Sequence, residues 1–158
     1  MSIISTTSFD PASALSAAAF GATLAGANCL SEETEVMTAE GPMAASALRP
    51  GDLVLTRDNG FQPVIDATRA YVSAARQSTD TGYAAVTLAP GALAGQDRAI
   101  TLSAAHPVLI EDEAGETVFV KAVELADAKL KCGNITYIAL TFENHEVIFA
   151  NGAMVASN

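Results

Sequence analysis

The 158-residue chain contains no tryptophan, and aromatic side chains make up only 6% of it. A surface that stacks nucleic-acid bases depends on aromatic side chains, so we expect none here. Cations are also scarce, since 8 Lys and Arg stand against 18 Asp and Glu and leave a formal net charge of −10. Because phosphate contacts need clustered cations, this balance argues against nucleic acid as a partner and against docking on an anionic membrane.

Cysteine and histidine are equally sparse, with two residues of each. Cys29 and Cys132 are too few for a disulfide framework, although one bridge between them is possible in an oxidising compartment. The chain has neither a CxxC nor an HxxxH pair, and the spacing of these cysteines with His106 and His145 matches no compact zinc module. We therefore expect no bound metal, and nothing else in the sequence indicates a cofactor.

Residues 1–28 differ in composition from the rest of the chain. Ala, Ser and Thr dominate them, and Asp10 carries their only charge. The apolar stretch at 12–27 is similar to part of a signal peptide, but the cationic start is missing and no membrane-spanning run follows. We expect a short N-terminal flanking segment, partly helical around 14–20, ahead of one domain at residues 29–158, with no membrane contact. The compartment is left open.

From Cys29 onward the sequence is typical of an all-β domain. Short runs rich in Val, Ile, Leu, Thr and Phe are separated by turn signals such as Pro50-Gly51-Asp52. The Asn59-Gly60 pair predicts a type I′ hairpin turn, which needs positive φ at both residues. Short helical turns are expected at 44–48 and 122–126, and an exposed loop at 73–82. The expected strands are 34–38, 53–57, 61–71, 84–88, 99–103, 108–111, 117–121, 135–142, 146–151 and 153–156.

Two stretches of the chain share one pattern, in which a strand, an acidic Gly-containing turn and a second strand lead to Ala-x-x-Leu. The first runs from Val36 to Leu48, and the second from Val108 to Leu125. This echo is either a coincidence or the trace of a duplicated β unit folded about a pseudo-two-fold axis.

Residues able to carry chemistry stand at both ends and in the middle of the β region. Cys29 opens it, Ser103 and His106 belong to a Ser-Ala-Ala-His sequence, His145 lies near the end, and Asn158 is last. Taken singly, each has a structural explanation, such as a small buried cysteine or a hydrogen-bonded histidine. What points to a function is the order in which these residues occur together along the chain.

In that order, residues 29–158 resemble the Hint domain, the self-processing module of Hedgehog proteins and inteins, and most closely its bacterial intein-like group. The resemblance implies an all-β, horseshoe-like fold with pseudo-two-fold symmetry, in agreement with the echo. It also implies single-turnover processing of the chain's own backbone, by splicing or by cleavage. The partners would be the chain's own flanking segments, and we expect a monomer. The matching segments are Cys29-Leu30, Thr34-Glu35-Val36, 48–60, Ser103-Ala104-Ala105-His106 and 137–158.

The resemblance implies a first reaction at the Asn28–Cys29 bond. The thiol of Cys29 would attack the carbonyl of Asn28, and the amide would become a thioester. His106 would polarise or protonate the scissile nitrogen, which is general-acid work suited to an imidazole. Ser103 would orient His106 or donate to the oxyanion.

A second reaction is implied at the other end. Asn158 would attack its own main-chain carbonyl through its side-chain amide, form a succinimide and release whatever follows. His145 is the best candidate to assist. Ser157 stands where most inteins have His, and the Asp frequent in the block at 137–142 is absent. With nothing after Asn158, the reaction expected of this chain is release of residues 1–28.

Two other interpretations stay open. One is a Hint-like β module that has lost its chemistry and acts in binding or secretion, which the departures at Ser157 and at 137–142 favour. The other is a Cys–His hydrolase acting in trans, with Cys29 and His106 as the pair. In either case Cys132 is expected to be a turn residue.

Overall fold

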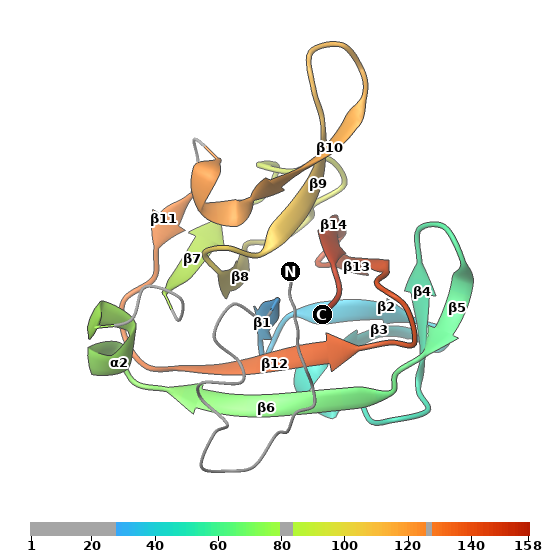
Figure 1. Ribbon diagram of the computed structural model, residues 1–158, viewed down its shortest axis with the longest axis horizontal. Helices are drawn as coiled ribbons and strands as arrows, with labels where there is room; N and C mark the ends of the chain where they lie inside the picture. The colour runs from blue at the N-terminus through green and yellow to red at the C-terminus, as the bar shows by residue number, and fades with distance from the viewer. Residues whose placement is uncertain (1–27, 80–83, 126–127) are drawn as a thin grey trace.

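The computed structural model describes residues 28–79, 84–125 and 128–158. It is nearly all β, as predicted, and its strands form two sheets (Figure 1). The helix expected around 14–20 lies outside the described residues. Among the helices that are described, none has the length and apolar character needed to cross a membrane.

One sheet has six antiparallel strands with β1 near its centre. Leu30 in β1 pairs with Ile138 on one side and with Leu102 on the other, while Cys29 pairs with Ala139. The predicted nucleophile therefore begins a central strand, where the backbone is held on both sides. The strand order is β11 (Lys129–Leu130), β7 (Ala85–Leu88), β8 (Ile100–Ser103), β1 (Cys29–Ser31), β12 (Ile135–Thr141) and β6 (Asp66–Val72).

The second sheet has eight strands and is centred on the hairpin of the last two. Ala150 pairs with Val36 in the first half of the chain, and Val155 pairs with Val108 in the second half. The final strand thus leads Asn158 toward the middle of the molecule. The order is β10 (Thr117–Lys121), β9 (Pro107–Glu111), β14 (Ala153–Ala156), β13 (Val147–Ala150), β2 (Glu35–Thr38), β4 (Leu53–Thr56) and β5 (Gly60–Pro63), with β3 (Gly41–Ala44) paired to β2.

The echo in the sequence corresponds to repeated structure. The hairpin β2–β3 leads into the 3₁₀ turn η2 (Ala45–Ala47), and the hairpin β9–β10 leads into η4 (Ala122–Glu124). The N–H of Ala45 donates to the carbonyl of Thr34 at 2.7 Å, and the N–H of Ala122 donates to the carbonyl of His106 at 2.9 Å. This repeated arrangement agrees with the duplicated-unit interpretation, and His106 occupies in the second copy the position of Thr34 in the first.

Alternation along the strands separates two buried layers of side chains. Leu30, Leu102 and Ile138 belong to the main core, which joins residues of both sheets. Because neighbours along a strand point to opposite faces, Cys29 and Tyr137 fall in a second, smaller cluster. The predicted nucleophile is a core residue, 2% exposed.

The single strand predicted at 61–71 is wrong, because the chain changes sheets inside it. β5 ends at Pro63, which has no N–H to donate, and β6 begins at Asp66. Between them, the N–H of Val64 donates to the carbonyl of Asp52, just before β4, and the N–H of Ile65 donates to the carbonyl of Thr141, the last residue of β12 in the six-stranded sheet.

The loop expected at 73–82 contains a short helix, α2 (Ala74–Thr79). Ser73 caps it, since its Oγ accepts the N–H of Arg76 at 3.1 Å, and Asn134 Oδ1 accepts the N–H of Ala74 at 2.9 Å. The short strands β1 and β11 were not predicted, and β3 was expected only as the second strand of the repeated pattern at 36–48. β3 begins at Gly41, a residue that the sequence pattern assigned to a turn.

The hairpin predicted at Asn59-Gly60 is present, but its turn is not type I′. Thr56 pairs with Gly60, which leaves a three-residue loop closed by Gly60 at φ 66. Among the described residues other than glycine, positive φ occurs at Asn151 alone, with φ 47. Gly152 follows it with φ 84, so the two-residue turn with positive φ at both positions joins β13 to β14.

Candidate active site

The backbone of Cys29 lies against the Ser-Ala-Ala-His segment. Its N–H donates to Ser103 Oγ at 3.2 Å, and its carbonyl oxygen lies 3.1 Å from His106 Nδ1. The Ser103 hydroxyl also points to that carbonyl, at the long distance of 3.5 Å. β8 ends at Ser103, beside β1, and a tight turn follows. The N–H of His106 donates to Ser103 O at 3.0 Å and closes this turn, so that His106 also lies against Cys29.

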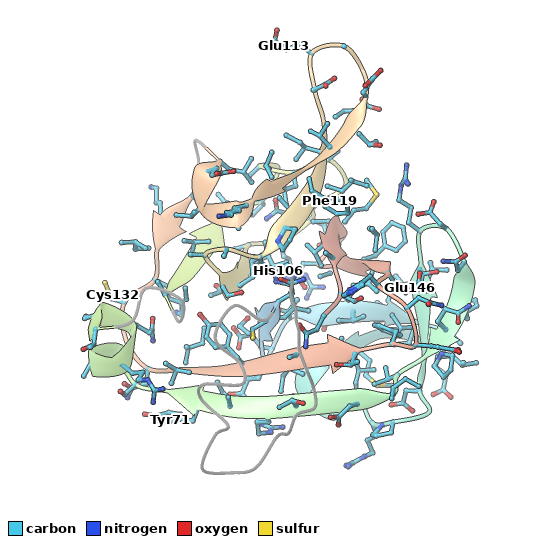
Figure 2. All side chains as sticks on the ribbon, in the orientation of Figure 1. Tyr71, His106, Glu113, Phe119, Cys132 and Glu146 are labelled. Atoms are coloured by element: carbon cyan, nitrogen blue, oxygen red, sulfur yellow. The ribbon has the colours of Figure 1, made fainter. Side chains whose placement is uncertain are left out.

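His106 joins the two ends of the domain. Its Nε2 lies 2.7 Å from the carbonyl oxygen of Ala156 in β14, while Nδ1 faces Cys29. Figure 2 shows the ring in the interior, above β1 and close to β9 and β14, and it is 1% exposed. The sequence placed His106 at the scissile nitrogen, whereas in the structure the group hydrogen-bonded to that nitrogen is Ser103.

The residue before the predicted nucleophile contacts the last two residues of the chain. Asn28 Nδ2 donates to the carbonyl of Ser157 at 2.8 Å, and the N–H of Asn28 donates to Asn158 Oδ1 at 3.4 Å. The structure thus brings Asn28, Cys29, Ser103, His106 and the terminal pair into one site.

A separate set of bonds holds the terminal pair in place. The N–H of Ser157 donates to Glu146 O at 2.7 Å, the N–H of Glu146 donates to Ser157 Oγ at 2.9 Å, and the N–H of Asn158 donates to Leu140 O at 2.9 Å. The buried carboxylate of Glu146 accepts Asn59 Nδ2 at 2.8 Å. Sequence reasoning missed Glu146 and named Asn28 only as the residue before the scissile bond, because only the folded chain brings their partners close.

Two of the sequence candidates make none of these contacts. His145 is exposed, and none of the hydrogen bonds just described reaches it. Cys132 is exposed and unpaired, at the edge of the molecule near α2 in Figure 2, and Cys29 is buried and unpaired. The bridge between the two cysteines that the sequence left open is not formed. Among the described residues, no three His, Cys, Asp or Glu side chains gather as a metal site.

Burial sets the protonation of the site. It raises the pKa of the Cys29 thiol from 9.0 to about 12, so the resting thiol is protonated. Burial also lowers the pKa of His106 below 6.5, and this effect outweighs that of the two nearby carbonyl oxygens, which favour the charged ring. Burial raises the pKa of Tyr137 as well, and the nearby Cys29 adds to this. At neutral pH the side chains of Cys29, His106 and Tyr137 are therefore uncharged.

The fold agrees with comparisons to known structures. The chain is similar to a DnaB intein from Synechocystis sp. PCC 6803, with TM-score 0.58 and 12% identity over 83% of this chain and 99% of that one. It is similar to a bacterial intein-like domain from Clostridium thermocellum, with TM-score 0.55 and 14% identity over 82% and 98%. A variant of the gp41-1 intein gives TM-score 0.53 and 16% identity over 81% and 98%.

No curated protein matches the chain in sequence. At the identities above, the solved structures establish the fold alone. A family model described as the Hint domain matches residues 28–158, which is every residue of the β domain and the one before it. The chain belongs to the Hint domain family.

Proposed function

We propose that the chain processes its own backbone, by a Cys29 N-to-S acyl shift at one end of the domain and by Asn158 cyclisation at the other. The observation that carries the proposal is the meeting of the two ends. Asn28 and Ser157 are 129 positions apart, yet they share a 2.8 Å hydrogen bond beside His106. Holding reacting groups of one chain together can supply on the order of 7–11 kcal/mol of a barrier.

In the first step, the sulfur of Cys29 bonds to the carbonyl carbon of Asn28 and the C–N bond breaks. The thiol proton is lost and the departing nitrogen gains one, so the products are a thioester and a free amine on Cys29. Ser103 Oγ, 3.2 Å from that nitrogen, supports a role as the group that returns the proton once the nitrogen becomes pyramidal. His106 holds the Cys29 carbonyl on the other side of the residue.

In the second step, Asn158 Nδ2 attacks the carbonyl carbon of its own residue and the bond to the next residue breaks. The carbonyl carbon lies at the end of a backbone fixed by Leu140 and Glu146. Ser157, which stands where most inteins have histidine, helps to fix this backbone, because its hydroxyl accepts the N–H of Glu146. The role of His145 in this step stays a prediction, tested by His145→Ala.

The first step is tested by mass spectrometry of the full chain in hydroxylamine or thiol at neutral to mildly alkaline pH. We expect loss of residues 1–28, because both reagents intercept a thioester. Cys29→Ala abolishes the loss, and the exposed Cys132→Ala is the matched control that leaves it unchanged. Cleavage of Cys29→Ala at the parent rate would exclude Cys29 as the nucleophile.

The second step is tested by attaching a reporter domain after Asn158. We expect its slow release with a succinimide at residue 158, no release from Asn158→Ala, and normal release from Asn144→Ala, which changes an exposed asparagine. If the reporter stays attached for days while residues 1–28 are lost, the chain cleaves at its first junction only.

Two observations bear on the other interpretations. A trans-acting hydrolase needs an open cleft at its nucleophile, but Cys29 and His106 are 2% and 1% exposed. Two surface hollows on the described part of the chain are lined by other residues, such as Met37 in one and Leu53 in the other. A non-reactive binding module is favoured by the protonated, buried thiol and would leave the mass of the chain unchanged in both experiments.

A further inference from the structure

Asn28 is bound to the end of the chain in a way that neither proposed reaction requires. Attack by Cys29 makes and breaks bonds only at the main-chain carbonyl of Asn28, and the side chain of Asn28 takes no part in it. Instead, its side-chain amide donates to Ser157 O at 2.8 Å and its main-chain N–H reaches Asn158 Oδ1 at 3.4 Å. Both groups of Asn28 therefore engage the residues that undergo the second reaction.

These two bonds restrict the motion that Asn158 needs. Cyclisation requires the carboxamide to turn until Nδ2 faces the carbonyl carbon of its own residue. The carboxamide oxygen is held on the N–H of Asn28, and the peptide between residues 157 and 158 is held from one side by Asn28 and from the other by Leu140. The remaining bonds to the terminal pair come from inside the domain and persist whatever happens to Asn28.

Resting on the function proposed above, we infer that Asn28 is a positioning residue that restrains Asn158 while the Asn28–Cys29 bond is intact. Transfer of Asn28 to the sulfur of Cys29, or its departure, moves both donors and frees the carboxamide. Release at Asn158 then follows cleavage at Cys29. The side chain suits this role because it is short and carries a donor, whereas Asp has the same shape without the donor.

The test uses a chain extended beyond Asn158 by a reporter domain, in the Cys29→Ala background, so that Asn28 never leaves. We expect slower reporter release than from the parent sequence. Adding Asn28→Ala, or Asn28→Asp, speeds release about fivefold to tenfold, the size expected from losing one neutral hydrogen bond. Asn144→Ala in the same background is the matched control and leaves the rate unchanged. Equal or slower release after either Asn28 change overturns the inference.

A second measurement separates the failure of this inference from the failure of the proposed function. If no variant, including the parent, releases the reporter, the Asn158 reaction itself is wrong. The restraint is then judged by ¹⁵N relaxation of the Asn158 side-chain amide in the parent and in Asn28→Ala. A lower order parameter in the variant, with no change in Asn144→Ala, supports the restraint. An unchanged order parameter overturns it.

Discussion

At the scale of single residues, His106 faces more acceptors than a neutral ring can serve. Carbonyl oxygens lie at 3.1 Å from Nδ1 and 2.7 Å from Nε2, and a neutral imidazole has a single N–H. A protonated ring would donate to both, but burial lowers its pKa. The ring is therefore held neutral by its surroundings, and one carbonyl lacks a donor from it.

We expect the free energy of unfolding to fall as the pH drops below 6.5. The unfolded ring binds a proton near that pH, whereas the buried ring binds one only at lower pH, so the stability present above 6.5 is lost as the pH falls toward the folded pKa. Urea unfolding of the parent and of His106→Gln between pH 8 and 5 checks this. The difference between them should shrink by up to about 1.4 kcal/mol per pH unit. A constant difference would contradict it.

The raised pKa of Cys29 makes the cleavage rate increase with pH as well, over a more alkaline range. Because burial raises the thiol pKa to about 12, the reactive thiolate is a small fraction that grows about tenfold per pH unit below that value. We expect cleavage in excess hydroxylamine, which is uncharged over this range, to rise about tenfold per unit from pH 7 to 9. A flat profile would mean that the thiol loses its proton to a base inside the site.

At the scale of elements, the turn between β13 and β14 packs directly on the connection between β7 and β8. Gly152 has φ 84, and a Cβ placed on it would overlap the carbonyl oxygen of Gly95. Gly115, at the tip of the β9–β10 hairpin, has nearly the same φ of 83 but open space around it.

Comparing alanine substitutions at these two glycines distinguishes the cost of backbone strain from the cost of steric overlap. Gly115→Ala should cost about 1–2 kcal/mol, from the left-handed conformation alone. Gly152→Ala adds an overlap with backbone that cannot turn aside, and we expect about 1–3 kcal/mol more. Chemical denaturation measures both. Equal losses in the free energy of unfolding would show that the backbone at Gly95 can shift to accommodate the added Cβ at no energetic cost.

The elements predicted best from the sequence are those whose signals are local. The strand expected at 117–121 has its observed bounds, and so does that at 153–156, because alternating side chains and Gly-containing turns mark them. The break at Val64 and Ile65 was missed because it depends on Asp52 and Thr141, which are distant in sequence.

The features of the candidate site also divide into those that the sequence indicates and those that only the folded chain shows. Cys29, Ser103, His106 and the terminal asparagine could be named from the order of residue types along the chain. The hydrogen bonds of Asn28 could not, because the residue follows a segment of low complexity and its partners lie at the opposite end of the sequence.

At the scale of the whole molecule, the two halves of the chain complete each other's sheets. β1 and β6 pair with β12, β1 pairs with β8, and β2 and β4 pair with β13. Each half by itself therefore leaves long strand edges without partners.

We expect a chain cut after Thr79 to fold only when its two fragments are mixed. Fragments 1–79 and 80–158 alone should show no cooperative unfolding. An equimolar mixture should regain it, with a midpoint that rises with concentration as association requires. Circular dichroism during denaturation measures this. Cooperative unfolding of either fragment by itself would contradict the prediction.

The two copies of the repeated unit differ at the position that His106 occupies. In the first copy, Ser31 Oγ and Thr34 Oγ1 form a buried hydroxyl pair at 2.8 Å, where the second copy has Ser103 and His106. The same backbone arrangement therefore carries Thr in one copy and His in the other. Because the bonds donated by Ala45 and Ala122 are accepted by main-chain carbonyls, they do not depend on which of these side chains stands at the position.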